Sequence, residues 1–237
     1  MSAAFAVRPA APEDAPAIAR VFGIAFDDYR RGFGIDAPTL SDLWADSLKA
    51  RVPATTVAVL NGGPAGPDPT RPLTAQVPAV VGFVVTVRPG ATEENGTAGD
   101  RQGRMGRLVQ VLGLRGLWRL PAFFGPIGMA YARRSQASDE LYISLLAVDP
   151  AHQGRGIGQA LLGAAEAEAR EAGAAGILLH AAANNVRART AYDRAGYEVV
   201  CTVRAAWAGP ARIPAYVALR KPLRPDPAPR IAALGLA

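Results

Sequence analysis

The chain has 237 residues, of which 50% are hydrophobic and 19% are charged. This length fits one domain, or one domain with an insertion, and the hydrophobic content excludes disorder throughout the chain. Cys201 is the single cysteine, and His152 and His180 are the only histidines. A disulfide scaffold and a cysteine-based zinc cluster are therefore excluded, and we expect no metal site.

The net charge of +6 comes from 26 basic and 20 acidic residues, and by itself it suggests an anionic partner. Seven arginines fall within residues 101–134, a stretch without acidic residues, which leaves 19 basic residues against 20 acidic ones elsewhere. The positive charge therefore belongs to one segment. We expect no nucleic-acid binding, because the chain has no helix-turn-helix or RNP motif.

Hydrophobic patterning and Gly- or Pro-rich breaks predict an alternation of strands and helices. In chain order the predicted elements are a strand at 5–8, helices at 12–26 and 40–50, strands at 55–60 and 79–87, one or two helices at 101–134, a strand at 141–148, a helix at 156–172, a strand at 176–182, a helix at 186–195, and strands at 197–204 and 213–219. The second helix has Thr39 or Ser41 as its expected cap. Strands 55–60 and 79–87 are expected to pair as a hairpin with a long connection.

A targeting segment and a membrane span are both absent from the sequence pattern. The first residues lack the apolar core of a signal peptide and become acidic at Glu13 and Asp14. No stretch reaches about eighteen uncharged apolar residues, the length that a transmembrane helix needs. With one cysteine and no signal peptide, we expect a cytoplasmic protein, either a monomer or a homodimer.

The most informative stretch is a glycine-rich turn at residues 148–158, VDPAHQGRGIG, between a predicted buried strand and a predicted helix. Glycines let the backbone pass close to a ligand and point successive N–H groups into one hollow. The following helix N-terminus adds positive potential, so the turn suits a diphosphate. Its spacing fits neither the G-x-G-x-x-G dinucleotide fingerprint nor the G-K-[ST] ending of a P-loop.

Two blocks carry a resemblance to a known family. The pattern Q-x-x-G-x-G at 153–158, after a strand ending in LAVDP, is similar to the acetyl-CoA-binding motif of the GNAT (GCN5-related) N-acetyltransferase superfamily. The pattern N-x-x-A-x-x-x-Y-x-x-x-G-Y at 185–197 resembles the strand–helix region that follows in that family. The resemblance is strongest over 141–203, extends over 5–87 and does not cover 90–138.

The resemblance implies an α/β fold with a mixed, mostly antiparallel central sheet flanked by helices. Two central strands of this family splay apart to admit the pantetheine arm. We expect a single N-acetyltransferase domain at 1–221, with a helical insertion at about 90–138 between the third and fourth strands. A flexible C-terminal tail is expected at 222–237.

The resemblance also implies that acetyl-CoA is the acyl donor. Backbone N–H groups of the turn would hold the diphosphate, the strand edge at 146–148 would pair with the pantetheine arm and polarise the acetyl carbonyl, and Asn185 would hydrogen-bond the arm. The implied cofactor-binding residues are Leu146, Ala147, Val148, Gln153, Gly154, Arg155, Gly156, Ile157, Gly158, Asn185 and Tyr192.

Tyr192 is implied as the group that protonates the leaving thiolate. Asn185, Ala188 and Tyr192 are spaced i, i+3 and i+7, which places them on one face of the short helix. The branch of the family that acetylates ribosomal-protein N-termini has a catalytic Glu five residues before this Asn, where this chain has His180. His180 is one candidate base, and Glu140, acting through water from the start of the preceding strand, is the other.

The acceptor is expected to be a primary amine, either a small molecule or a peptide N-terminus, which attacks the thioester directly. The alternatives are a CoA-binding regulator without turnover and an acyltransferase that uses longer acyl-CoA. For the insertion, a helical flap beside the acceptor site is weighed against an interfacial helix that contacts a membrane or another subunit.

Overall fold

The computed structural model of the chain describes residues 5–60, 79–91, 106–113, 139–204 and 212–224. Its elements are β1 (Phe5–Pro9), the 3-10 turn η1 (Pro12–Asp14), α1 (Ala15–Ala25), α2 (Asp27–Phe33), α3 (Ala37–Ala50), η2 (Val52–Ala54), β2 (Thr55–Leu60), β3 (Val80–Val87), β4 (Leu141–Val148), η5 (Pro150–His152), α6 (Ile157–Glu171), β5 (Gly176–Ala182), α7 (Val186–Arg194), β6 (Glu198–Arg204) and β7 (Ala215–Pro222).

The strands form a seven-stranded sheet in the order β1-β2-β3-β4-β5-β7-β6. Every neighbouring pair is antiparallel except β4 and β5, which run parallel. This is the mixed, mostly antiparallel sheet that the sequence predicted, and β2 and β3 pair as the expected hairpin. The predicted bounds of β2, β4 and β5 coincide with the observed ones, because each is an uninterrupted β-forming run between turn residues.

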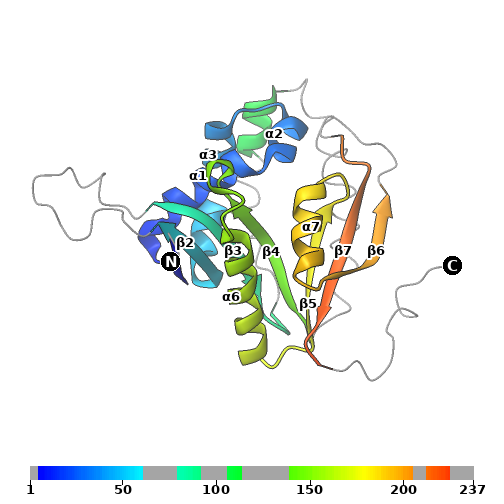
Figure 1. The fold of residues 1–237 in the computed structure, drawn as a ribbon. Helices are drawn as coiled ribbons and strands as arrows, with labels where there is room; N and C mark the ends of the chain where they lie inside the picture. The colour runs from blue at the N-terminus through cyan, green and yellow to red at the C-terminus, as the bar shows by residue number, and fades with distance from the viewer. Residues whose placement is uncertain (1–4, 61–78, 92–105, 114–138, 205–211, 225–237) are drawn as a thin grey trace, which may run out of the picture.

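Helices cover both faces of the sheet. On one face α1, α2 and α3 pack against alternate residues of the central strands, such as Phe83 of β3 and Leu145 of β4. On the other face α6 and α7 pack against the residues that point the opposite way, such as Val84 and Ile143. Figure 1 shows α6 and α7 in front of the sheet, with α1 and α3 on the far side.

The parallel pair β4–β5 is short. It joins only Leu141 with Ile177, Tyr142 with Leu178, and Ile143 with Leu179, after which the two strands diverge toward the end of the sheet near α2 (Figure 1). Directly after this point β4 contains a bulge. Thr86 of β3 pairs with Ile143 and Val85 pairs with Leu145, so Ser144 is the extra residue.

Two helical predictions at the N-terminal end differ from the structure. Helix α3 begins at Ala37 with Asp36 as its cap, whose Oδ1 accepts the N–H of Thr39 at 2.9 Å. The predicted caps, Thr39 and Ser41, were wrong because Pro38 fits the first helical turn, where its missing N–H costs nothing. Helix α2 was not predicted at all.

Most of the predicted insertion lies outside the described residues, including six of its seven arginines. Residues 106–113 are helical, Leu108 is buried in the core beneath α1 and α3, and Arg107 forms an exposed ion pair with Asp46 at 2.9 Å. In the described part of the chain, none of the helices has the length and hydropathy needed to span a bilayer. The expected tail from residue 225 onward is also outside the described residues.

Candidate active site

A pocket of about 880 Å³ opens where β4 and β5 diverge. Its walls are the diverging strand segments 143–148 and 179–182, residues 153–154 and 156–159 with helix α7, and the start of α2. The predicted residue Arg155 does not line it. We call residues 153–159 and α7 the turn side of the pocket. We call α2 together with His180 and Asn184 the α2 side. The pocket therefore runs between the two faces of the sheet.

One edge of β4 faces this pocket without a strand beside it. Leu145, Leu146, Ala147 and Val148 pair with β3 along their other edge, while pairing with β5 ends at Ile143. Alternate backbone N–H and C=O groups of this segment therefore face the pocket, and an extended amide-containing ligand can pair with them as an added strand does. The predicted residues Leu146, Ala147 and Val148 all line the pocket.

The glycine-rich turn lies at one end of the pocket. Gly154 and Gly156 have φ values of 80° and 83°, a conformation that strains any residue with a side chain. Gly156 caps α6 without a side-chain bond, so the first N–H groups of the helix, from Ile157 to Gln159, have no intrahelical partner. Because the dipole of this 15-residue helix also favours negative charge at its start, the turn is suited to an anion.

Asp149 and Gln153 fasten this turn to the sheet. The amide of Gln153 donates from Nε2 to the Val148 carbonyl at 3.1 Å. Asp149 accepts the Ala151 N–H at 3.0 Å and the Arg20 guanidinium at 3.1 Å. Burial alone would raise the pKa of Asp149, but these two hydrogen bonds hold it below its usual value. Sequence reasoning missed the role of Asp149, since Arg20 is distant in the chain.

Asn185, Ala188 and Tyr192 lie on the same wall of the pocket, as their i, i+3, i+7 spacing predicted. Asn185 caps the helix by accepting the Ala188 N–H at 3.1 Å, which leaves its amide N–H₂ as the group available to a ligand. Tyr192 is buried among the core residues under α6, and burial raises its pKa to about 12. Arg187 reaches back to the turn, with Nη2 3.9 Å from where a Cβ on Gly154 would stand. Asn185, Arg187, Ala188 and Tyr192 all line the pocket.

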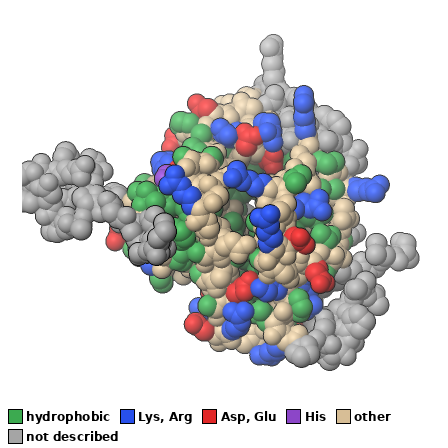
Figure 2. Space-filling view, viewed as in Figure 1, with side chains coloured by type: hydrophobic (Ala, Val, Ile, Leu, Met, Phe, Trp, Pro, Cys, Tyr) green, Lys and Arg blue, Asp and Glu red, His purple; other side chains and the backbone are tan. Residues whose placement is uncertain are grey.

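Positively charged side chains mark this side of the molecule. Figure 2 shows Lys and Arg side chains near the centre of the face on which α6 and α7 lie. Of the α7 arginines, Arg187 and Arg194 line the pocket, whereas Arg189 instead donates to the Ala183 carbonyl at 3.1 Å. The turn side of the pocket therefore offers guanidinium groups as well as backbone N–H groups to an anionic ligand.

His180 lies on β5 one residue beyond its last pair with β4. Its neighbours Leu179 and Ala181 pack toward α6 and α7, so its own side chain lies on the opposite face of the sheet, as Leu178 and Tyr142 do. His180 lines the pocket, and its Nδ1 is 3.1 Å from the Tyr142 hydroxyl. Tyr192 and His180 thus approach one cavity from opposite faces of the sheet.

Glu140, the other candidate base, lies before the paired start of β4. Its carboxylate is buried and accepts a hydrogen bond from Nε of Arg220. It is not among the residues that line the pocket. The geometry therefore favours His180 over Glu140 as the group that exchanges protons with a ligand there.

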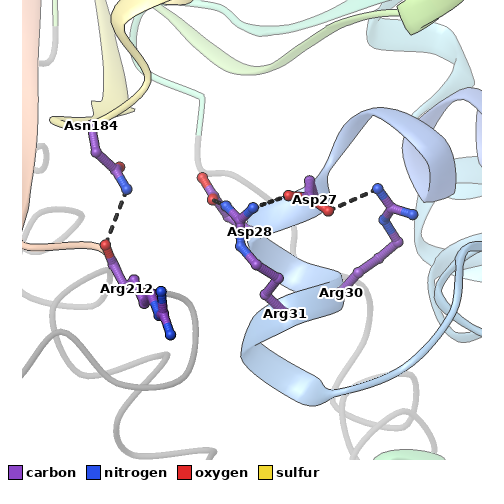
Figure 3. Close-up of polar contacts among 6 residues, drawn as sticks. All are labelled: Asp27, Asp28, Arg30, Arg31, Asn184 and Arg212. Atoms are coloured by element: carbon purple, nitrogen blue, oxygen red, sulfur yellow. Dashed lines mark hydrogen bonds and ion pairs between the residues drawn. The ribbon is translucent and has the colours of Figure 1, made fainter.

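The α2 side carries charged residues that sequence reasoning missed. In α2, Asp27 pairs with Arg30 at 2.8 Å and with Arg31, and Asp28 pairs with Arg31 at 2.5 Å. Figure 3 shows these side chains across from Asn184, whose amide donates to the Arg212 carbonyl at 3.0 Å. Burial raises the pKa of Asp28 despite its contact with Arg31. The i, i+3 and i, i+4 spacing in DDYRR was the signal available for this helix.

The described residues contain no group of three His, Cys, Asp or Glu side chains placed to hold a metal ion. The residues that line the pocket offer backbone edges, amides, arginines, two carboxylates, three tyrosines and one imidazole. Such a lining suits an elongated ligand with an anionic end, an amide-containing arm and a reactive end between Tyr192 and His180.

Comparisons with known proteins agree with this arrangement. Residues 114–197 match the model of the acetyltransferase (GNAT) family. No curated protein sequence matches the chain significantly. Among solved structures, Ard1 from Thermoplasma volcanium superposes with a TM-score of 0.52 at 16% identity, covering 94% of this chain and 99% of that one.

Two further structures share the fold. The ribosomal-protein-S18-alanine N-acetyltransferase from Escherichia coli has a TM-score of 0.52 at 15% identity, with 94% of this chain and 96% of that one covered. A putative acetyltransferase from Salmonella typhimurium, determined with acetyl-CoA, has a TM-score of 0.51 at 16% identity, with 95% and 98% covered. Residues 114–197 thus match the GNAT family, and the chain as a whole shares the fold of these acetyltransferases, which supports an acetyl-CoA-dependent acyltransferase.

Proposed function

We propose that the protein transfers an acetyl group from acetyl-CoA to a primary amine by direct attack, with His180 as the base and Tyr192 as the proton donor. The observation that carries this proposal is the pocket between β4 and β5, which Tyr192 and His180 enter from opposite faces. The acceptor is a small-molecule amine or a peptide N-terminus.

Acetyl-CoA would lie along the pocket with its diphosphate on the turn. Supporting this, the turn offers backbone N–H groups of residues 153–158, and Arg187 stands beside Gly154. The pantetheine arm would pair with the open edge of β4 at 146–148 and with the amide of Asn185. A backbone N–H of that edge would also polarise the acetyl carbonyl, so that charge developing on its oxygen is stabilised in the transition state.

The acceptor nitrogen would reach the thioester from the face on which His180 lies. An ammonium group first gives one proton to His180 and becomes a nucleophile, for which a neutral imidazole is suited near pH 7. The nitrogen then forms a bond to the carbonyl carbon and releases its second proton, and the carbon–sulfur bond breaks with its electron pair going to sulfur, which takes up a proton through Tyr192. The product amide leaves on the α2 side.

Tyr192 would donate to the departing sulfur from the other face. Because its pKa is about 12, its hydroxyl is protonated at every pH at which the fold is expected to work. An ordinary thiol has a pKa of about 8.5, so the phenol passes its proton to the sulfur only as it receives the second proton that the acceptor nitrogen releases. The hydrogen bond to sulfur therefore supplies the stabilisation during bond cleavage, and no net charge stays on Tyr192.

An acceptor screen that follows release of the CoA thiol tests the proposal. Purified protein is mixed with acetyl-CoA and with polyamines, aminoglycosides and peptides that have a free N-terminus. Amine-dependent thiol release is the expected result. Tight CoA binding without release for any amine would indicate a regulator instead, and faster release from longer acyl-CoA would indicate a different donor.

The role of His180 is tested by a matched pair of variants. His180→Ala is expected to lower kcat by about a hundredfold or more, with little change in acetyl-CoA affinity. His152→Ala alters the other histidine of the chain, which does not line the pocket, and should retain turnover. Wild-type turnover in His180→Ala would remove His180 as the base.

A further inference from the structure

The Tyr142 side chain contacts the imidazole of His180 where β4 and β5 begin to diverge. Tyr142 pairs with Leu178 in the short parallel ladder and is only 3% exposed. Its hydroxyl lies 3.1 Å from Nδ1 of His180, and the two rings meet edge-on at 5.7 Å between centroids. A fixed backbone position and a buried ring therefore hold this hydroxyl in place beside the histidine.

The direction of this hydrogen bond decides what His180 can do. If the Tyr142 hydroxyl donates to Nδ1, a neutral imidazole carries its proton on Nε2 and has no free lone pair at that atom. If Nδ1–H donates to the Tyr142 oxygen, Nε2 carries the lone pair of the neutral imidazole and is the atom that can accept a proton. Once Nε2 is protonated, the same Nδ1–H bond becomes charge-assisted and stabilises the imidazolium.

We propose that Tyr142 is a positioning residue, which accepts the Nδ1–H of His180 and thereby holds its imidazole in the tautomer whose Nε2 faces the acceptor amine. This inference rests on the proposed function, because it assigns a partner to the proposed base. In this proposal His180 is the base that contacts the substrate, and the buried hydroxyl of Tyr142 acts only through His180.

Other ionisable groups share the pocket with His180 and contribute to its field. Among the described residues they are Asp27, Asp28, Tyr29 and Arg31 from α2, Arg187, Tyr192 and Arg194 from α7, and Tyr216 from β7. Cys201 of β6 packs against the cluster that contains Tyr142. All of these remain when Tyr142 is replaced by Phe, so comparing that variant with the wild type isolates the Tyr142 hydroxyl.

A double-mutant cycle is the kinetic test. Tyr142→Phe is expected to lower kcat by about tenfold without changing KM for acetyl-CoA, and to have no further effect when combined with His180→Ala. Tyr197→Phe is the matched control, because Tyr197 is also buried but lies on the opposite face with a hydroxyl that has no partner among the described residues. An equal loss of kcat from Tyr142→Phe with and without His180 would overturn the proposal.

NMR of the imidazole nitrogens provides a test that needs no turnover. The chain has two histidines, so His152 serves as the internal reference. In the wild type we expect the Nδ1–H tautomer at His180. In Tyr142→Phe we expect a mixture of tautomers, because Nδ1–H loses the hydroxyl that accepts it. The acid limb of kcat/KM should move to lower pH, because the imidazolium loses a charge-assisted hydrogen bond.

The outcomes separate the two proposals. If His180→Ala is inactive but Tyr142→Phe leaves the tautomer and the pH profile unchanged, Tyr142 is only a packing residue and the inference fails while the proposed base stands. If the tautomer responds as expected but no amine is acetylated, the proposed function fails and the contact is structural. A lower melting temperature of Tyr142→Phe with wild-type kinetics would also overturn the positioning role.

Discussion

On the turn side of the pocket, residues 153–159 and α7 lie within one stretch of the chain, whereas the α2 side combines α2, His180 and Asn184 from distant stretches. The turn side presents mostly backbone N–H groups and arginines. The α2 side presents ion-paired carboxylates, aromatic rings and one imidazole. The proposed donor site therefore depends mainly on local backbone conformation, while the proposed acceptor site depends on how the sheet and α2 pack together.

On the turn side of the pocket, the largest expected effect comes from removing the hydroxyl of Tyr192. Tyr192→Phe should lower kcat by about a hundredfold, because the departing sulfur loses its hydrogen-bond donor, with KM for acetyl-CoA nearly unchanged. Steady-state kinetics with a thiol reagent measures this. Since the pKa of Tyr192 is about 12, the wild-type rate should show no fall attributable to its ionisation below about pH 11. A basic limb near pH 9 that disappears in the variant would contradict this assignment.

A methyl group on the turn tests whether backbone conformation builds the donor site. Gly156→Ala should destabilise the fold by about 1 kcal/mol and weaken acetyl-CoA binding by about tenfold, because φ at this position is 83°. Gly163→Ala is the control, since a Cβ meets open space at both positions but Gly163 is helical. Denaturation and calorimetric titration measure both effects, and the control should be stabilised by about 0.5–1 kcal/mol. Equal effects of the two variants would break the comparison.

The contribution of the arginines of the turn side to acetyl-CoA binding can be tested with variants of α7. Arg187→Ala should raise KM for acetyl-CoA by about fivefold and leave kcat unchanged, because an exposed guanidinium–phosphate contact contributes modestly to binding. Added salt should reduce the difference from the wild type. Arg189→Ala, on the same helix but outside the pocket lining, is the control and should bind acetyl-CoA normally. A comparable rise in KM for both variants would show that the effect is not local.

The smallest expected effect lies on the α2 side. Asp28→Asn should change KM for the acceptor by a few-fold and leave KM for acetyl-CoA unchanged, which dual-substrate kinetics can separate. Burial raises the pKa of Asp28, so its contribution to stability is greatest below its unfolded pKa and is lost as pH rises through the folded pKa. The stability of the wild type relative to the variant should therefore fall as pH rises above about 4. A change confined to KM for acetyl-CoA would contradict the assignment of acceptor binding to the α2 side.

The structural features that could be predicted from the sequence are those that depend on residues close together in the chain. The strands β2, β4 and β5 were predicted with their observed bounds, and the glycine turn before α6 was found from its spacing. These features follow from alternation, turn chemistry and the steric freedom of glycine, which act over a few residues. The predicted i, i+3, i+7 face of α7 likewise brought Asn185, Ala188 and Tyr192 to one wall of the pocket.

The contacts between residues that are far apart in the chain could be identified only from the tertiary structure. The parallel ladder of β4 and β5 stops after Ile143 and Leu179, and that register opens the pocket and brings Tyr142 to His180. The support of Asp149 by Arg20, the withdrawal of Glu140 into an ion pair with Arg220, and the position of α2 depend on packing between elements far apart in the chain. Local patterns carry no information about such contacts, because strand register and helix packing are set by the burial of whole faces.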